Sequence, residues 1–329
     1  MDLTGKRILI TGGTGTFGHA IIPKLLEYNI NKIIIFSRDE LKQYLMREKF
    51  KNHKHFNKLA FFIGDIRDKD RLYLTLINVD IIIHAAALKR VDSIEYNPIE
   101  AIKTNILGTQ NLIETSILHK IPYFMSISTD KAVSPSNLYG GTKFCLEKLT
   151  IAANNLSGGV TKFSVSRYGN VLGSRGSVVQ IFKNLKEQKK DITITHKDMT
   201  RFTMDIENAI TFVIDNIKNM CGGEIFVPKL LSYKITSLAK YFSNDYKIVG
   251  IRAGEKIYEE MISINEGPNT RILDNKFIII GDNLLNKTIL NEKYGMLEIY
   301  GFKSYNSQEN DYITDDILYK KIEKLMLNN

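Results

Sequence analysis

A glycine-rich turn near the N-terminus constrains the fold of this chain more than any other feature. An apolar run at residues 7–10 leads into TGGTGTFG, then a stretch with helical spacing at 20–28, then a second apolar run at 32–36. This order is typical of a strand–helix–strand unit in which a dinucleotide pyrophosphate meets backbone N–H groups at the start of the helix. Glycines lack the Cβ atoms that would block the approach. We therefore predict a dinucleotide site that includes Gly12, Thr14, Gly15, Thr16, Phe17 and Gly18.

The rest of the N-terminal half repeats the alternation of apolar strands and helices. Further strands are predicted at 59–63, 81–84, 123–128 and 163–168, with helices at 68–78, 98–119 and 138–155. Continuous apolar strands separated by helices indicate a parallel sheet covered on both faces, which is the doubly wound α/β or Rossmann fold. After about residue 170 the pattern becomes mixed. We predict a dinucleotide-binding Rossmann domain over residues 1–170 and a smaller substrate-binding part over 171–329, partly interleaved with the first.

The residues after the second strand select the dinucleotide. A carboxylate at this point accepts hydrogen bonds from the ribose 2′-hydroxyl of NAD, whereas a serine and a guanidinium suit the 2′-phosphate of NADP. Ser37 and Arg38 therefore predict NADP; the alternative is that Arg38 is a surface side chain and that Asp39 binds the ribose. The adenine edge is expected at Asp65 and Ile66, after the third strand. The predicted cofactor site also contains Asp39, Glu40, Leu41, Lys42, Ala85, Ala86 and Lys89.

Polar side chains with catalytic potential follow the predicted fifth strand. Thr129, Asp130 and Lys131 come directly after it, at the edge where open α/β sheets bind ligands. Tyr139 and Lys143 are four residues apart in a predicted helix, so their side chains lie on one face. An ammonium beside a phenol lowers the pKa of the phenol and lets tyrosine act as a base. We predict an active site from these five residues; a loop salt bridge and a surface pair are the structural alternatives.

Seven motifs carry a resemblance to a known family: TGGTGTFG at 11–18, SRDELK at 37–42, HAAALK at 84–89, STDK at 128–131, YGGTK at 139–143, RYGNVLGSRGS at 167–177 and GIRAGEK at 250–256. Together they resemble the extended short-chain dehydrogenase/reductase family and, within it, the inverting UDP-N-acetylglucosamine 4,6-dehydratases of the pseudaminic acid pathway. In that family an Asp-Lys pair distinguishes inverting enzymes from retaining ones, which carry Asp-Glu. Lys131 matches the inverting form. The resemblance extends to about residue 262.

The resemblance implies a role for each predicted catalytic residue. Tyr139 takes the proton from the sugar O4 while hydride passes from C4 to NADP⁺, and Thr129 hydrogen-bonds to O4. Lys131 then removes the C5 proton, and Asp130 protonates the departing C6 hydroxyl. Reprotonation of C5 from the other face inverts that centre, while Lys143 holds the nicotinamide ribose. The residues assigned to the UDP-sugar by the same resemblance are Lys89, Asn170, Arg175, Arg252 and Glu255.

Composition narrows the partners and the compartment. The formal charge of +9 suits an anionic partner, but the lysines are scattered, so a solvated surface is expected rather than a nucleic-acid patch. The small-molecule UDP-sugar is the partner that the resemblance implies. Two cysteines, no signal-peptide pattern and no apolar stretch of ~20 residues predict a cytoplasmic protein without a membrane span. No metal-ligand spacing is visible, and a homo-oligomer is expected from the resemblance. A related UDP-sugar 4,6-dehydratase or epimerase of capsule sugar synthesis and a non-catalytic NADP-binding regulator remain alternatives.

Overall fold

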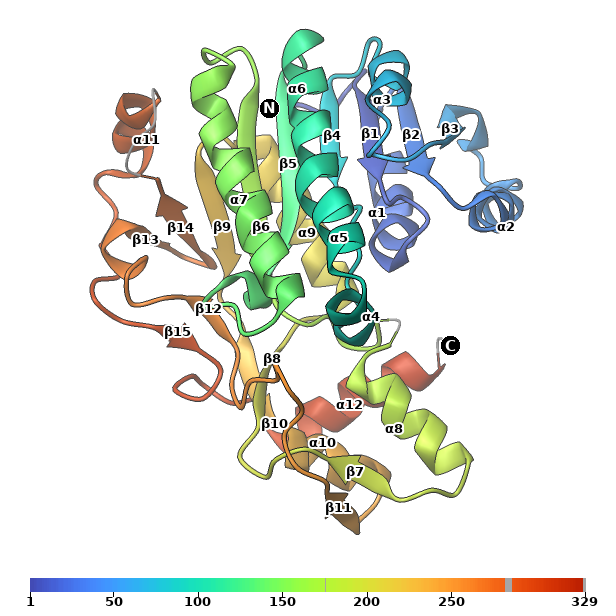
Figure 1. Ribbon diagram of the computed structural model, residues 1–329, viewed down its shortest axis with the longest axis vertical. Helices are drawn as coiled ribbons and strands as arrows, with labels where there is room; N and C mark the ends of the chain where they lie inside the picture. Colours follow the sequence, from blue (N-terminus) through green and yellow to red (C-terminus); the bar gives the residue numbers. More distant parts are fainter. Residues whose placement is uncertain (175, 282–285, 328–329) are drawn as a thin grey trace.

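A large sheet organises the chain, of which the computed structural model describes residues 1–174, 176–281 and 286–327 (Figure 1). Nine strands of this described part form the sheet. They are β1 Arg7–Thr11, β2 Lys32–Ser37, β3 Leu59–Ile63, β4 Ile81–His84, β5 Tyr123–Thr129, β6 Lys162–Tyr168, β9 Glu224–Pro228, β13 Thr270–Leu273 and β14 Lys276–Ile280. The order across the sheet is β13-β14-β9-β6-β5-β4-β1-β2-β3. Every residue of β4 and β9 is buried, as expected for strands covered on both faces.

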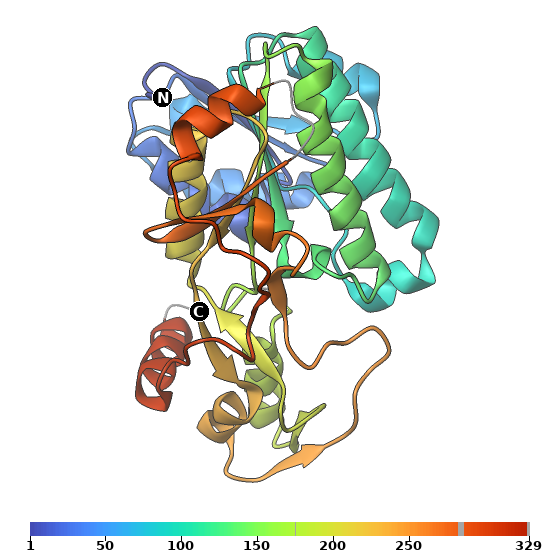
Figure 2. The same cartoon turned by 90° about the vertical axis from the view of Figure 1, so that its left-hand side faces the viewer.

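Helices cover both faces of this sheet. They are α1 Thr16–Leu26, α2 Glu40–Phe50, α3 Lys69–Thr75, α4 Val91–Tyr96, α5 Pro98–Ala101, α6 Gly108–Leu118, α7 Leu138–Leu156, α9 Ile206–Asn219 and α11 Lys287–Tyr294. One apolar core joins α1, α2 and α9 to the sheet, and a second joins α3, α6 and α7 to the opposite face. Figure 2 shows α6 and α7 on one side of the sheet and α9 on the other. The predicted doubly wound fold is confirmed.

The structure adds three features to that prediction. Helix α2 follows β2 although the sequence pattern did not predict it; the Asp39 carboxylate caps it by accepting a hydrogen bond from the backbone N–H of Lys42 at 2.9 Å. The helix predicted at 98–119 is interrupted by a π-helical turn at Ile102–Leu107, between α5 and α6. Strand β14 pairs with β9 and β13 in antiparallel directions, so the sheet is mostly rather than wholly parallel.

The C-terminal half contributes both to the sheet and to a separate layer beneath it. Strands β9, β13 and β14 extend the sheet, whereas a third apolar core lies in the lower part of Figure 1. The elements of that layer are β7 Ile192–Ile194, β8 Thr200–Thr203, β10 Leu231–Lys234, β11 Tyr246–Ile248, α8 Val178–Glu187, α10 Ile235–Phe242 and α12 Asp315–Leu327. A short ladder of β12 Glu260–Ile262 and β15 Tyr305–Asn306 completes this half. The functional division of the chain at residue 170 stays a prediction.

A buried arginine on β6 joins three parts of the fold. Arg167 is 1% exposed, and its Nε and Nη2 donate to the two carboxylate oxygens of Glu147 on α7 at 2.9 and 2.6 Å. The same guanidinium donates to Glu266 at 3.1 and 2.8 Å and to the carbonyl oxygen of Met261 at 2.9 Å. Paired, charge-assisted hydrogen bonds of this kind fix geometry strongly. They attach α7 to β6 and to the segment that follows β12.

We expect Glu147→Ala to lower the free energy of unfolding by about 3 kcal/mol, because it leaves a buried guanidinium with half of its carboxylate partners. Urea denaturation measures the change. The control is Glu114→Ala, which removes the partner of Lys69 in an ion pair whose side chains are 49% and 40% exposed, and should cost less than about 1 kcal/mol. Equal effects of the two substitutions would contradict the role given to Arg167.

Candidate active site

The polar residues singled out in the sequence lie where β1, β4, β5 and β6 end. In Figure 1 this edge of the sheet faces the lower layer that carries α8, α10 and α12. Thr129 ends β5, and Asp130 and Lys131 follow it in a 3₁₀ turn. Helix α7 begins at Leu138, capped by the Asn137 carboxamide oxygen, which accepts a hydrogen bond from the Gly140 N–H at 2.9 Å. The site is therefore built from strand ends and one helix start, which hold side chains more rigidly than long loops do.

A crevice of about 270 Å³ runs over the glycine-rich turn. Gly12 has a φ of +65°, and a Cβ there would lie 2.8 Å from the Cα of Ala86. A Cβ at Gly18 would lie 1.8 Å from the carbonyl oxygen of Gly13, so α1 can start this close to the turn only with glycine. Gly15, the N-cap of α1, provides no side-chain cap. The N–H groups of the first helical turn therefore remain available to an anion.

The structure brings together about half of the predicted cofactor residues in this crevice. Those that line it are Gly12, Thr14, Ser37, Arg38, Asp39, Lys42, Asp65, Ile66 and Ala86. Those outside its lining are Gly15, Thr16, Phe17, Gly18, Glu40, Leu41, Ala85, Lys89, Tyr139 and Lys143. Glu40 and Leu41 are exposed on α2. Four further lining residues were not among the predicted ones: Phe36, Gly64, Ala87 and Thr104.

Charged side chains surround the end of the crevice beyond β2. Arg38 Nη1 lies 3.5 Å from Asp65 Oδ2, and Arg67 holds the same carboxylate at 2.7 Å. Asp39 caps α2 and forms an ion pair with Lys42 at 2.5 Å. The side chain and backbone of Lys42 hold the pKa of Asp39 below its usual value. The Asp39 carboxylate is thus already engaged by its own helix.

The carboxyl and amine of Asp130 and Lys131 meet directly. Asp130 is fully buried, and its Oδ1 accepts hydrogen bonds from the Thr129 hydroxyl at 2.8 Å and from Lys131 Nζ at 3.0 Å. Lys131 Nζ also donates to Asn170 Oδ1 at 3.1 Å and lies 3.3 Å from Glu259 Oε1. Burial, followed by the charge of Glu259, raises the pKa of Asp130 despite Lys131. Burial lowers the pKa of Lys131, but the two carboxylates outweigh it and raise that pKa above its usual value.

Tyr139 and Lys143 lie on one face of α7 but act on different partners. Burial raises the pKa of Tyr139 to about 12, although the charge of Lys131 and a hydrogen bond with Thr129 oppose the rise. Lys143 Nζ donates to the carbonyl oxygen of Ile127 at 2.6 Å, and burial lowers its pKa to about 8. In the protein alone burial dominates and Lys143 is bound to β5, so the lowering of the Tyr139 pKa by Lys143 stays a prediction.

Two buried polar residues position the wall of the crevice. Asn105, in the π-helical turn, accepts from the Leu88 N–H at 2.8 Å and donates to the Leu88 carbonyl at 2.9 Å and to Thr142 at 3.0 Å. His84 contacts the hydroxyls of Thr11 and Thr109 through its two ring nitrogens, and burial lowers its pKa to about 3. The segment at 85–89, which ends in the exposed Lys89, is thus held between α7 and the glycine-rich turn.

The loop that contains Arg252 and Glu255 is attached to the catalytic turn. The carbonyl oxygen of Gly254 accepts from Ser136 at 2.9 Å and from Asn137 at 3.0 Å. Lys256 Nζ donates to the Val133 carbonyl at 2.7 Å. Glu255 in turn accepts from the Arg252 N–H at 3.2 Å. Of the predicted substrate residues, Asn170 contacts Lys131 directly. Arg175 lies outside the described residues.

Comparison with known proteins places this site in a family. A family model described as a polysaccharide biosynthesis protein matches residues 8–280. The chain belongs to this family. The match includes the strand ends, the catalytic turn, α7 and the loop at 250–256, so it covers every part of the site that the structure describes.

Named relatives of the family agree with the resemblance predicted from the motifs. The chain is 51% identical over 280 residues to a Campylobacter jejuni protein named UDP-N-acetylglucosamine 4,6-dehydratase (inverting), covering 84% of this chain and 83% of that protein. It is 38% identical over 337 residues to a protein of Rickettsia felis named UDP-glucose 4-epimerase, covering 98% of this chain and 96% of that one. The predicted resemblance to the inverting dehydratases is confirmed by the first.

Solved structures show the same fold. The X-ray structure of Pen from Bacillus thuringiensis has a TM-score of 0.90 and 33% identity, and 99% of each chain is covered. A dTDP-glucose 4,6-dehydratase from Streptomyces venezuelae, with NAD bound, has a TM-score of 0.72 and 17% identity, covering 98% of this chain and 97% of that one. The likeness therefore continues beyond residue 262, where the sequence motifs ended.

The sequence motifs missed two charged residues beside the catalytic pair, Glu259 and Arg201. Glu259 is 3% exposed, lies beside Lys131, and is 3.5 Å from Arg201 Nε on β8. Arg201 is also buried and donates to the carbonyl oxygens of Thr200, Lys256 and Ile257. Tyr233, paired with Arg201 across β8 and β10, lies in the field of the same charges. The only sequence signal for Glu259 was its position shortly after the motif at 250–256, where the chain becomes apolar.

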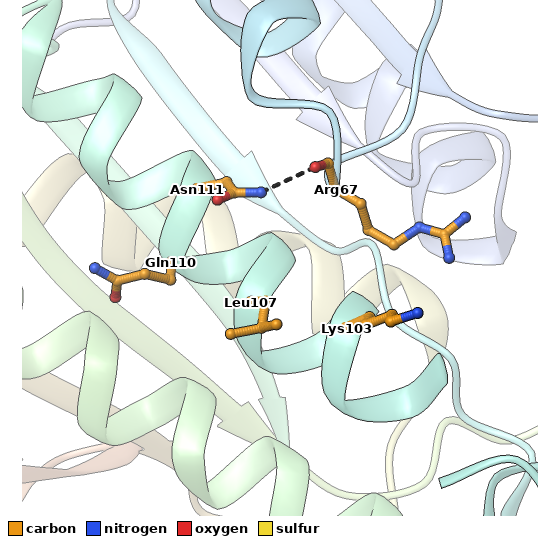
Figure 3. A pocket seen from close by; sticks show the side chains of 5 residues that line it. All are labelled: Arg67, Lys103, Leu107, Gln110 and Asn111. Carbon is orange, nitrogen blue, oxygen red and sulfur yellow. Dashed lines mark hydrogen bonds between the residues drawn. The ribbon is translucent and has the colours of Figure 1, made fainter. Parts of the chain in front are cut away.

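A second hollow of about 340 Å³ lies on the surface of α6, away from this cluster. Figure 3 shows its five lining residues, which are Arg67, Lys103, Leu107, Gln110 and Asn111. Asn111 donates to the Arg67 carbonyl at 3.1 Å. None of the acid–base residues lines this larger hollow, so the chemistry belongs to the strand ends. Across residues 1–174, 176–281 and 286–327 we find neither a cluster of metal ligands nor a helix that could span a membrane.

Proposed function

We propose that this protein is a UDP-N-acetylglucosamine 4,6-dehydratase that inverts C5, giving UDP-2-acetamido-2,6-dideoxy-β-L-arabino-hex-4-ulose. One observation carries the proposal. A buried carboxyl and an amine, Asp130 and Lys131, lie 3.0 Å apart beside a tyrosine on the adjacent helix. Elimination of water needs an acid and a base at neighbouring carbons, and oxidation at C4 needs a third proton acceptor. These residues supply all three groups in a hydro-lyase.

The crevice fits a nicotinamide dinucleotide, and we propose NADP. The uncapped start of α1 and the close approach of Gly12 to Ala86 suit a pyrophosphate. Asp39 is already engaged by the cap of α2 and by Lys42, whereas the Arg38 side chain is half exposed at the rim. A 2′-phosphate would bind Arg38 and Lys42 by charge-assisted hydrogen bonds. When bound, NADP⁺ accepts hydride from C4 and later returns it to C6, so no net oxidation occurs.

Tyr139 acts first in the proposed mechanism. Its phenolate oxygen, hydrogen-bonded with Thr129, takes the proton from the sugar O4 while the C4–H bond breaks. Burial raises the pKa of Tyr139 in the protein alone, so the phenolate would need additional positive charge, which a bound oxidised nicotinamide would supply. Lys143, held by the Ile127 carbonyl on the same helical face, is placed to bind the nicotinamide ribose. The 4-ketone that results makes the C5 proton acidic.

Asp130 and Lys131 then carry out the elimination. Transfer of a proton across their 3.0 Å hydrogen bond converts the ion pair into a carboxylic acid and a free amine. The amine of Lys131 takes the C5 proton, the C6–O bond breaks, and Asp130 protonates the leaving oxygen to give water. Each residue thereby returns to its ionised form. After hydride reaches C6, a solvent-exchangeable proton enters C5 from the opposite face.

The same residues argue against a simple 4-epimerase, although several relatives carry the name UDP-glucose 4-epimerase. Epimerisation at C4 uses Tyr139 and the cofactor but needs no base at C5 and no acid at C6. A buried carboxyl that took no part in the reaction would only destabilise the folded protein. The intact tyrosine and lysine of α7 likewise argue against a non-catalytic regulator.

The decisive test is the product formed from UDP-N-acetylglucosamine in deuterated water. We expect a 6-deoxy-4-keto sugar with deuterium at C5 and the L-arabino configuration, because the C5 proton is exchanged through an acid–base group. The C6 methyl should carry no solvent deuterium, since its new hydrogen came from C4. Proton NMR of fresh product measures both. A D-xylo product would refute inversion, and unreacted substrate would refute the dehydratase.

Tyr139→Phe should lower turnover at least ~100-fold while the cofactor stays bound, because the phenol is the O4 base. Steady-state kinetics and fluorescence of bound cofactor measure the two effects. Tyr123→Phe, at the opposite end of β5, is the matched control and should keep normal turnover. Near-normal activity of Tyr139→Phe would remove this residue from the mechanism.

Arg38→Asp should weaken NADP binding by about tenfold or more, since it removes a charge-assisted hydrogen bond and adds repulsion. NAD should bind equally well or better. Calorimetric titration of both dinucleotides gives the ratio. Arg47→Asp, the same change on a part of α2 that does not line the crevice, is the control. Unchanged NADP affinity in Arg38→Asp would show that this arginine does not contact the 2′-phosphate.

A homo-oligomer and a cytoplasmic location complete the proposal. Apolar side chains on neighbouring helices are exposed, among them Leu118 at 65% on α6 and Phe144 at 40% on α7. Association of two copies through these helices would remove that apolar surface from water.

A further inference from the structure

Glu259 is a charged neighbour of the Asp130–Lys131 pair, and the proposed mechanism gives it no role. Glu259 Oε1 lies 3.3 Å from Lys131 Nζ and 3.5 Å from Arg201 Nε. Its other oxygen, Oε2, is buried and has no hydrogen-bond partner among the described residues, and the same holds for Oδ2 of Asp130. Two carboxylates therefore share two cations in a cluster in which only the Lys131 side chain, at 23% exposure, reaches the surface to any extent. Burial of charges is costly unless each is well paired, so these four side chains depend on one another for their ionised state.

Glu259 reaches this position because its loop is fixed at both ends. On one side, Lys256 and Gly254 hydrogen-bond to the catalytic turn. On the other, Glu259 donates its backbone N–H to Ser307 at 3.0 Å and its carbonyl accepts from the Ser307 N–H at 2.8 Å. Arg201 is fixed in turn by three backbone carbonyls. These contacts fix the backbone of Glu259, and its carboxylate lies between Lys131 and Arg201.

The elimination requires that Asp130 and Lys131 hold one proton between them. With a second proton the pair has no base for C5, and with none it has no acid for C6. The number of protons bound by two strongly interacting groups belongs to the pair rather than to either residue. A fixed negative charge within about 4 Å favours protonated states, and a fixed positive charge favours deprotonated ones.

We propose that Glu259 is a positioning residue that keeps the Asp130–Lys131 pair singly protonated. Its carboxylate holds Lys131 against Asp130 and cancels the charge of Arg201. This role rests on the proposed function, since it concerns the elimination step. With Glu259 ionised, the cluster of Asp130, Lys131, Arg201 and Glu259 is neutral when the pair holds one proton. Without that charge, Asp130 alone would face two cations and would give up its proton at a lower pH.

The charged and titratable groups around Asp130 come from five elements: Lys131 from its own turn, Tyr139 from α7, Arg201 from β8, Tyr233 from β10 and Glu259 from the segment before β12. Burial raises the pKa of Tyr233 to about 12 and that of Tyr139 to about 12, so both are neutral near pH 7. Glu259 and Arg201 are thus the fixed charges nearest the pair, and Lys256 adds a positive charge that helps to keep Glu259 ionised.

The test compares pH profiles of turnover for the wild type and Glu259→Gln, which keeps the shape and removes the charge. Both limbs of the profile should move to lower pH in Glu259→Gln, by about one unit or more, because loss of a negative charge lowers both apparent pKa values of the pair. Above the shifted alkaline limb, C4 oxidation should proceed while elimination stalls. Reduced nicotinamide should then accumulate in a single turnover, seen by its near-ultraviolet absorbance.

Two further variants make the outcome unambiguous. Glu260→Gln, the same change one residue away, removes a carboxylate that accepts hydrogen bonds from Ser134 and Ser304, and should leave the profile unchanged. Glu259→Asp keeps the charge and should slow turnover without moving the limbs. If Glu259→Gln does not fold by circular dichroism, Glu259→Asp is decisive, and a shift of its limbs to lower pH would overturn the proposal.

An unshifted profile in folded Glu259→Gln, or equal slowing of oxidation and elimination, would show that Glu259 is only structural. Either result would leave the proposed function intact. Absence of any dehydration by the wild-type protein would instead overturn the proposed function itself, so the two failures are distinguishable.

Discussion

The buried guanidinium of Arg167 is the constraint on which the rest of the site depends. It binds Glu147 on α7 and Glu266 after β12, and so fixes one helix and one distant segment relative to β6. Tyr139, Lys143 and Glu147 follow one another at helical spacing on α7, so fixing the last fixes the direction in which the first two point. The loop that delivers Glu259 ends beside the same arginine. A structural ion pair thus aligns two halves of the catalytic machinery.

Charge balance among buried side chains explains why the site contains so many ionised groups. A lone buried lysine would lose its proton, and a lone buried carboxyl would keep its own. Placed together with Arg201 and Glu259, Asp130 and Lys131 can exchange a proton with little change in total charge. Such an exchange produces an acid and a base in one step, and elimination across C5 and C6 requires both. Tyr139 differs because the positive charge that would stabilise its phenolate comes from a bound cofactor and not from the chain.

Local signals predicted most of the fold because they depend on neighbours in sequence. The strands at 59–63 and 81–84 were placed at their observed ends, since apolar runs bounded by turns define them. Helix α2 was missed because its exposed apolar residues, such as Leu41 and Tyr44, blur the helical period. Strands β13 and β14 were missed for another reason: their pairing with β9 is antiparallel and distant, and the parallel pattern gave no indication of it.

For the site, the sequence by itself determined the chemistry, and the tertiary structure decided the balance of charges. Motif spacing identified Thr129, Asp130, Lys131, Tyr139 and Lys143, because strand ends and helical periodicity bring such residues together by local rules. Glu259 and Arg201 are far from Lys131 in the chain, so no local rule connects them to it. Nor can spacing give the burial that raises the pKa of Tyr139. Electrostatic energies depend on distance and solvent in three dimensions, and only the folded chain fixes both.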